Sequence, residues 1–187
     1  MAKRDSSKRE RLVEAAVKLA YQQGFVRTSL ADIATESDVP LGNVYYYFKT
    51  KDDIGTAILA YRKQQFRQMQ ERLAALSSPR ERLVAFIDST VGNAANVARK
   101  GCPMGSLCAE LLKVPGELAD DSNTLLAVPM AWMAEQFSEM GHAEDAEALA
   151  LQMQSALQGV SLMTQSFRDP DLLAREGARL KAWIETL

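Results

Sequence analysis

The sequence predicts an all-α protein. Apolar residues recur at helical spacing along almost the whole chain, helix-capping and helix-stopping residues separate these stretches, and no alternating pattern typical of strands interrupts them. With 187 residues, of which 47% are hydrophobic and 25% are charged, the chain has the size and balance of a folded globular protein. We therefore expect about nine helices and no sheet.

The first part of the chain contains three predicted helices. The first covers about residues 7–24, where a capping box opens it and a glycine offers a left-handed stop. Ser29, with Asp32 three residues later, caps a second helix of about two turns. Pro40 breaks that helix and starts a third, which reaches about Phe48. Two short helices joined by a tight turn after a longer one predict a helix-turn-helix unit.

The rest of the chain is predicted to form longer helices. Thr50 and Asp53 cap a fourth helix, over about residues 51–74, which connects the helix-turn-helix unit to the remainder. Further helices are expected at about residues 79–98, 103–114, 117–140, 143–168 and 170–186. We accordingly expect a helix-turn-helix domain over residues 1–50 and a helical domain over residues 51–187.

The composition excludes several classes of protein. Cys102, Cys108 and the single His142 cannot supply a disulfide scaffold or a zinc site of the usual spacing. Because the sequence also has no nucleotide-binding loop, we predict neither an enzyme nor a cofactor. No targeting pattern opens the chain, and we expect a cytoplasmic protein without a membrane partner.

Charge is distributed unevenly along the chain. Residues 1–51 hold nine basic and six acidic side chains, a balance of +3, whereas the net charge of the whole chain is −2. A basic N-terminal part attached to an acidic remainder suggests a polyanionic partner for the first part alone.

Three consecutive tyrosines in the third predicted helix give the strongest functional signal. Val44 and Phe48 are spaced to face inward. The positions left on the outward side of this helix are Leu41, Gly42, Asn43, Tyr46 and Tyr47. Phenolic hydroxyls donate to phosphates, a glycine lets the backbone approach closely, and asparagine pairs with base edges. This set predicts contact with DNA, with a core position as the alternative for Tyr45.

Two motifs flank the predicted turn. Residues 28–34 read Thr-Ser-Leu-Ala-Asp-Ile-Ala, and residues 39–51 carry Val, Gly, Tyr, Phe and Lys at every third position. Both resemble the DNA-binding domain of TetR-family transcriptional regulators, although Asp38 and Pro40 stand where the family often has glycine and serine. The resemblance implies phosphate contacts by Thr28, Tyr45, Tyr46, Tyr47 and Lys51, base contacts by Leu41, Gly42 and Asn43, and a place for Ser29 on the same surface.

The resemblance also implies a ligand pocket in the C-terminal helices. Methionines gather between residues 104 and 163 together with aromatic side chains, and such residues can line an adaptable apolar cavity. Ordinary core filling explains the same pattern. The candidate lining residues are Phe86, Met104, Leu107, Leu111, Met130, Trp132, Met133, Phe137 and Met163, with Glu110 as a candidate polar anchor or, alternatively, an exposed residue.

Residues 101–111 read Gly-Cys-Pro-Met-Gly-Ser-Leu-Cys-Ala-Glu-Leu. They are similar to a segment found in one branch of the family, in which some regulators respond to reactive electrophiles. Cys102 precedes a predicted helix and follows Lys100, and both features favour a thiolate. Cys102 is therefore a candidate sensing thiol, with an inert buried cysteine as the alternative.

The predicted helix over residues 143–168 has two faces without charge. One face is broadly apolar and the other carries small residues, so the helix needs two neighbours. With the last helix it predicts a two-fold, four-helix dimer contact, and packing of Gly159 inside one chain is the alternative. The expected interface residues are Leu151, Ser155, Gly159, Leu162, Ser166, Leu173, Leu180 and Ile184.

We thus predict a homodimeric, ligand-responsive DNA-binding regulator. It is expected to repress transcription from a palindromic operator and to release the DNA when a small apolar or electrophilic effector binds. A helical small-molecule carrier or adaptor without DNA binding is the alternative, and salt-dependent affinity for double-stranded DNA separates the two.

Overall fold

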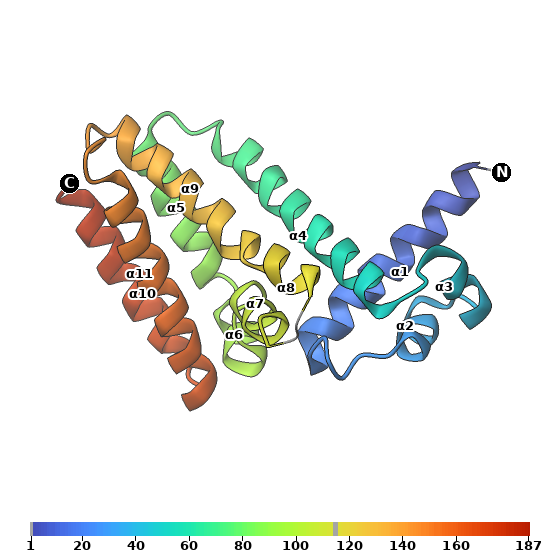
Figure 1. Cartoon of the computed structure of the whole chain (residues 1–187). Coiled ribbons are helices and arrows are strands. Elements are labelled where there is room, and N and C mark those ends of the chain that lie inside the picture. The colour runs from blue at the N-terminus through green and yellow to red at the C-terminus, as the bar shows by residue number, and fades with distance from the viewer. Residues whose placement is uncertain (1, 114–115) are drawn as a thin grey trace. The chain divides into compact units, whose positions relative to one another are not determined.

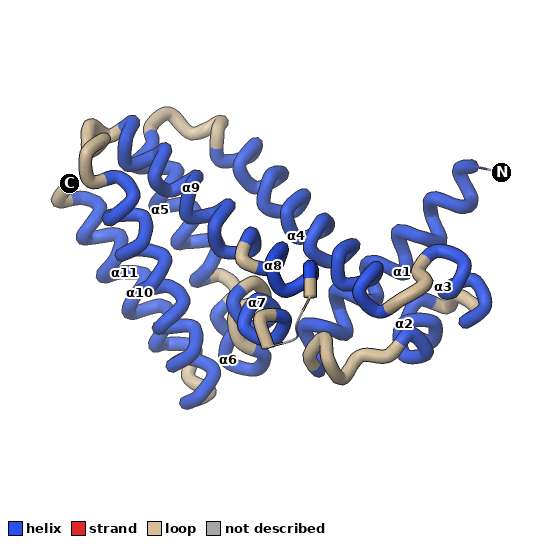
Figure 2. The backbone as a smooth tube through the Cα atoms, viewed as in Figure 1, coloured by secondary structure: helices blue, strands red, loops and turns tan. Residues whose placement is uncertain are grey.

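A computed structural model describes the backbone of residues 2–113 and 116–187, and the side chains of these residues from residue 8 onward. Every regular element in these ranges is an α-helix, which confirms the predicted fold class (Figures 1 and 2). In chain order the helices are α1 (Ala2–Gln23), α2 (Leu30–Ser37), α3 (Leu41–Tyr47), α4 (Lys51–Leu73), α5 (Pro79–Val91), α6 (Ala94–Lys100), α7 (Gly105–Leu111), α8 (Glu117–Ser122), α9 (Thr124–Glu139), α10 (Ala146–Phe167) and α11 (Pro170–Glu185).

Three helix boundaries differ from those expected. Helix α1 already begins at Ala2, so the expected start at residue 7 lies inside the helix. The helix expected over residues 79–98 is divided into α5 and α6 at Gly92 and Asn93, two residues of low helix propensity. Asn123 similarly separates α8 from α9. In both divided helices, apolar periodicity continues across the break, and periodicity alone therefore does not reveal it.

The predicted caps of the short helices are present. Ser29 and Asp32 form a complete capping box at the start of α2, and Thr50 and Asp53 exchange the equivalent bonds before α4. Asp38 ends α2 in the left-handed conformation, with φ 51° and ψ 46°, which glycine adopts most readily and aspartate can also adopt. Pro40 precedes α3 without a side-chain cap, so the start of α3 depends on the fixed φ of proline.

The chain forms two compact units, which do not follow the expected division at residue 50. Unit 1 comprises residues 1–64 and 107–123, and unit 2 comprises residues 65–106 and 124–187. The segment 107–123, which contains most of α7 and all of α8, therefore packs with the helix-turn-helix part rather than with the other C-terminal helices. None of the helices in the described ranges is long and apolar enough to cross a membrane.

Each unit has its own core. In unit 1, α2 packs against α1 and α3, and Leu12, Ile33 and Val44 are almost completely buried. In unit 2, α5, α9, α10 and α11 form a closed ring of helix contacts. Its centre holds the fully buried Met133, Phe137 and other apolar side chains. These two residues were candidate pocket-lining residues, and the structure places them in the packed interior.

Candidate nucleic-acid interface and internal cavity

The outer face of α3 is exposed, while its inner face holds the helix in place. Val44 and Phe48 are buried, as their spacing predicts. Leu41, Tyr45 and Tyr46 rank among the large exposed hydrophobic side chains of the described residues, and Tyr46 is 68% exposed. The exposed or half-buried set, which we call the α3 face, consists of Leu41, Gly42, Asn43, Tyr45, Tyr46 and Tyr47.

The α3 face combines the functional groups that nucleic acids bind. A Cβ atom at Gly42 would have no neighbour within 4 Å, so the backbone there is open to close approach. The Tyr46 ring packs edge-on against Tyr47, with ring centroids 5.1 Å apart, and this contact restricts its orientation. Phenolic hydroxyls and an asparagine amide on one short helix can bind phosphates and a base edge.

Three further residues of the expected DNA surface have roles inside unit 1. Thr28 is only 3% exposed, and its hydroxyl donates to the Gly24 carbonyl at 2.8 Å. The Lys51 ammonium donates to the Val26 carbonyl at 2.6 Å and lies over the Phe25 ring. The hydroxyl of Ser29 belongs to the capping box described above. The structure therefore uses these polar groups to fix the turn between α1 and α2.

Two basic residues near the α3 face were not among the expected contacts. Arg27, in the turn before α2, and Lys49, after α3, both have exposed side chains. Neither belongs to the motif that identified the other positions, and their only sequence signal is the positive charge of this part of the chain. Both are placed to add sequence-independent attraction to a polyanion.

Glu110 has a role that the sequence did not indicate. Its carboxylate accepts hydrogen bonds from the backbone N–H groups of Phe25 and Val26, each at 2.8 Å, and so binds the turn after α1. Gly24 adjoins this carboxylate with φ +92°, and a Cβ atom there would lie 2.9 Å from Glu110 Oε1. Glu110 belongs to unit 1 with the buried Leu107 and Leu111, and none of the three lines the cavity described next.

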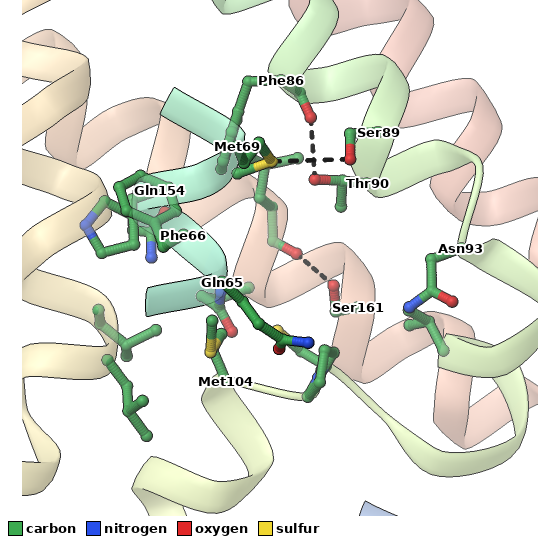
Figure 3. A pocket seen from close by; sticks show the side chains of 18 of the residues that line it. Gln65, Phe66, Met69, Phe86, Ser89, Thr90, Asn93, Met104, Gln154 and Ser161 are labelled. Atoms are coloured by element: carbon green, nitrogen blue, oxygen red, sulfur yellow. Dashed lines mark hydrogen bonds between the residues drawn. The ribbon is translucent and has the colours of Figure 1, made fainter. Parts of the chain in front are cut away.

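A cavity of about 380 Å³ lies within unit 2 (Figure 3). Of the expected ligand-binding residues, Phe86 and Met104 line it, and so does Cys102. The other expected residues of this unit lie elsewhere: Trp132 is buried behind the wall, Met130 lines a separate surface hollow, and Met163 is half exposed. The remaining lining residues come from α4, α5, α6, α9 and α10 and from two loop positions, Asn93 and Pro103.

The hydroxyl groups of the cavity wall bind their own helices or a neighbouring sulfur atom (Figure 3). Thr90 donates to the Phe86 carbonyl at 3.2 Å. Ser161 donates to the Leu157 carbonyl at 2.7 Å, and Ser89 points to the Met69 sulfur. Among the described residues, no cluster of histidine, cysteine, aspartate and glutamate could hold a metal ion.

The two cysteines have different surroundings. Cys102 is half-buried in the cavity wall, and its Sγ accepts a hydrogen bond from the Gly105 N–H at 3.4 Å. Cys108 is buried in unit 1, where desolvation raises the pKa of its thiol despite a hydrogen bond with Ser122. A raised pKa lowers the thiolate fraction of Cys108, and its burial also restricts access to a reagent.

Helix α10 presents an apolar face to solvent. Leu162 is 61% exposed and Phe167 is 70% exposed, and Leu151 and Met163 extend the same surface. The expected interface residues Ser155, Gly159 and Ser166 are exposed with them, and a Cβ atom at Gly159 would meet nothing within 4 Å. Helix α11, which packs beside α10, adds three exposed alanines: Ala174, Ala178 and Ala182. We call the exposed surface of α10 together with these alanines the α10–α11 face.

The expected interface residues of α11 do not lie on that face. Leu173, Leu180 and Ile184 are buried inside unit 2, and Gly177 approaches Val91 and Ile87 of α5. Helix α11 has one apolar stripe, which its own chain already covers, because α11 packs against α5, α6 and α10.

Comparisons with known proteins agree with these observations. The profile of the family described as "Bacterial regulatory proteins, tetR family" matches residues 12–58. The uncharacterized HTH-type transcriptional regulator YxaF of Bacillus subtilis (strain 168) is 28% identical over 174 residues, which are 90% of this chain and 91% of that protein. The HTH-type transcriptional repressor NemR of Escherichia coli (strain K12) is 25% identical over 123 residues, 63% of this chain and 59% of that protein. A crystal structure of a TetR transcriptional regulator from Chloroflexus aurantiacus superposes with a TM-score of 0.84 at 20% identity, over 98% of this chain and 96% of that one.

Proposed function

The chain belongs to the TetR family of transcriptional regulators, and on this premise we propose that its α3 face binds an operator. The protein is a ligand-responsive, DNA-binding repressor. The observation that carries the proposal is the α3 face itself. Its exposed tyrosines, glycine and asparagine have no role in the core, which Val44 and Phe48 already fill. Arg27 and Lys49 add positive charge beside it.

Regulators of this family are not enzymes, and we propose that this chain also acts by binding alone. Since operator DNA is its target, its expected place of action is the cytoplasm, where a bacterial chromosome lies. Release of the operator requires an effector that binds the DNA-incompetent arrangement more tightly, because equal affinity for both arrangements would shift nothing. The cavity of unit 2 is the proposed effector site, since it is a partly open, largely apolar space with a few polar groups.

Dimerisation is the second part of the proposal. Members of the family act as dimers, and the α10–α11 face is the surface proposed here for the contact. Small side chains on both helices allow two copies to approach closely about a two-fold axis. A two-fold dimer carries two α3 faces, and the operator expected for it is therefore palindromic.

Cys102 is a second candidate for effector detection. Its position in the cavity wall and the hydrogen bond from Gly105 to its sulfur support attack of the thiolate on an electrophile. The test is operator release by N-ethylmaleimide in wild type and in Cys102→Ser, with Cys108→Ser as the control. Equal release in all three proteins would remove Cys102 from the proposal.

The experiment for DNA binding uses double-stranded DNA selected by the protein from a random library, with affinity measured across a salt series. Tyr46→Phe removes only a hydroxyl, and we expect about 3- to 10-fold weaker binding to all sequences. Asn43→Ala is expected to relax selectivity at one base pair, by about 5- to 100-fold. Tyr61→Phe removes a hydroxyl outside the α3 face and serves as the matched control.

The outcomes separate the two functional classes. Salt-dependent, selective binding that the α3 variants weaken supports the repressor. Failure of the wild-type protein to bind any selected DNA at low salt would contradict it and favour the carrier or adaptor.

A further inference from the structure

Gln154 is the most buried of the amide side chains in the cavity wall. It lies on α10, is only 7% exposed, and lines the cavity of unit 2 (Figure 3). No described residue forms a hydrogen bond with its side-chain amide, whereas the hydroxyls of Thr90 and Ser161 donate to carbonyls of their own helices. The amide atoms of Gln154 keep accessible surface inside the cavity, so a molecule bound there can pair with them without displacing a protein group. The fold therefore does not account for a glutamine at this position.

The charges around the cavity restrict what can pair with Gln154. Among the described residues no acidic side chain lines the cavity, and Arg72, on the exposed last turn of α4, is the one charged lining residue. The other polar lining groups are neutral amides and hydroxyls, such as Gln65, Asn93 and Gln158. A cationic ligand would lose its hydration without gaining a counter-charge, and an anionic ligand would depend on Arg72 alone.

The apolar part of the wall favours a ring. Phe66 and Phe86 both line the cavity and pack edge-to-face, with centroids 6.2 Å apart and planes at 84°. Trp132 supports both rings from behind, at 6.1 Å and 5.5 Å. Rings held in this way offer rigid faces and edges to a planar apolar ligand. Cavities of this size bind small organic molecules.

We propose that the effector is an uncharged, ring-containing molecule whose amide or carbonyl group pairs with Gln154. This rests on the proposed function, since it specifies the effector of the same regulator. The Gln154 amide can both donate and accept, so a primary amide, which can do the same, is the preferred partner. The ring of the ligand then packs against Phe66 and Phe86.

Three probes of one shape and different charge test the proposal. They are 2-naphthamide, 2-naphthoate and (2-naphthyl)methylammonium, and their binding to the full-length protein is measured by calorimetry. We expect the neutral amide to bind at least 10-fold tighter than either ion. In Gln154→Met, which keeps the length of the side chain and removes the amide, its affinity should fall about 10-fold. Gln68→Met, on the exposed side of α4, is the matched control and should leave the affinity unchanged.

A second measurement does not depend on any probe. If the Gln154 amide has no partner in the ligand-free protein, Gln154→Met should melt at the same temperature as wild type or higher, because an apolar group replaces an unpaired polar one. A melting temperature several degrees lower would show that the fold itself satisfies this amide, and would overturn the proposal.

The probe results can also overturn it. Tightest binding by the naphthoate, lost in Arg72→Gln, would make the cavity a site for acids, and preference for the ammonium or no binding at all would equally reject the proposed class. Selective operator binding by the wild-type protein is measured in the absence of probes. If the operator is bound and the probes fail, the effector class is wrong and the repressor stands; if the operator is not bound either, the proposed function fails with it.

Discussion

Units 1 and 2 differ in whether their buried polar groups have hydrogen-bond partners and in whether their apolar surface is covered. In unit 1, the turn between α1 and α2 is held by Thr28, Lys51 and Glu110, and the α3 face carries three of its large exposed apolar or aromatic side chains. In unit 2, the described residues leave the Gln154 amide without a partner inside and the α10–α11 face uncovered outside. We therefore interpret unit 1 as a fold held by its own polar groups that presents the proposed DNA surface, and unit 2 as the unit that carries the proposed ligand site and the proposed dimer surface.

The largest expected effect comes from charging the uncovered face of unit 2. Leu162→Glu places a carboxylate on an apolar surface, and burying that charge in a dimer contact without a partner is strongly unfavourable. We expect a monomer by sedimentation equilibrium and roughly 100-fold weaker operator binding, because one α3 face then binds alone. Gln68→Glu introduces the same charge elsewhere on unit 2 and should remain dimeric. A dimer that survives Leu162→Glu would place the contact on another surface.

The next largest effect is expected from Glu110, whose carboxylate binds the backbone N–H groups of Phe25 and Val26 in unit 1. In Glu110→Gln, one amide oxygen can still accept from the turn, but the amide NH₂ then faces the second backbone N–H. Replacing two charge-assisted bonds to a half-buried carboxylate by one neutral bond should cost about 2 kcal/mol in the free energy of unfolding, measured with urea. Glu14→Gln, on the exposed side of α1, should change stability by less than about 0.5 kcal/mol. Equal stability of the two variants would mean that Glu110 does not hold the turn.

A smaller effect isolates the close approach of Gly24 to Glu110. Gly24 and Gly141 have nearly the same backbone conformation, with φ +92° and +98°, but a Cβ atom at Gly141 would meet nothing within 4 Å. Gly141→Ala therefore measures the conformational cost of a left-handed alanine, about 1 kcal/mol. Gly24→Ala should cost more, since its methyl group also displaces the Glu110 carboxylate. If the two cost the same, the carboxylate moves aside without loss.

The difference between the units also explains what the sequence could predict. The capping pairs Ser29–Asp32 and Thr50–Asp53 are three residues apart, so a local pattern is enough to find them. The inner face of α3 follows from helical spacing in the same way. Glu110, by contrast, binds backbone groups 84 and 85 residues away, and backbone N–H groups carry no signature of residue type. Its position beside two leucines suggested a ligand anchor equally well.

Side-chain direction limits prediction in unit 2. The apolar stripe of α11 has the spacing expected of an interface, yet Leu173, Leu180 and Ile184 fill the core, because a helix with one apolar stripe uses it against its own chain. Helix α10 has two faces without charge, and its own chain can cover only one of them. The sequence was therefore enough to assign the other face to a second copy of the protein. Gln154 lies between apolar neighbours on this helix, and only its burial and lack of a hydrogen bond single it out.

The smallest expected effect is a pH dependence of the caps in unit 1. Hydrogen bonds from the backbone and hydroxyl of Ser29 lower the pKa of Asp32, and those from the backbone of Thr50 and Lys49 lower the pKa of Asp53. A carboxyl whose pKa is lower in the folded state than the unfolded value of about 4 stabilises the fold above that value and loses this contribution as the pH falls through the folded pKa. The double variant Asp32→Asn, Asp53→Asn should therefore be less stable than wild type at pH 6, and the difference should shrink below about pH 4. Urea midpoints between pH 3 and pH 7 measure it, with Asp52→Asn as the control that removes a charge from the start of α4 but no cap. A difference that stays constant over this range would show that the caps act through shape and not through their charge.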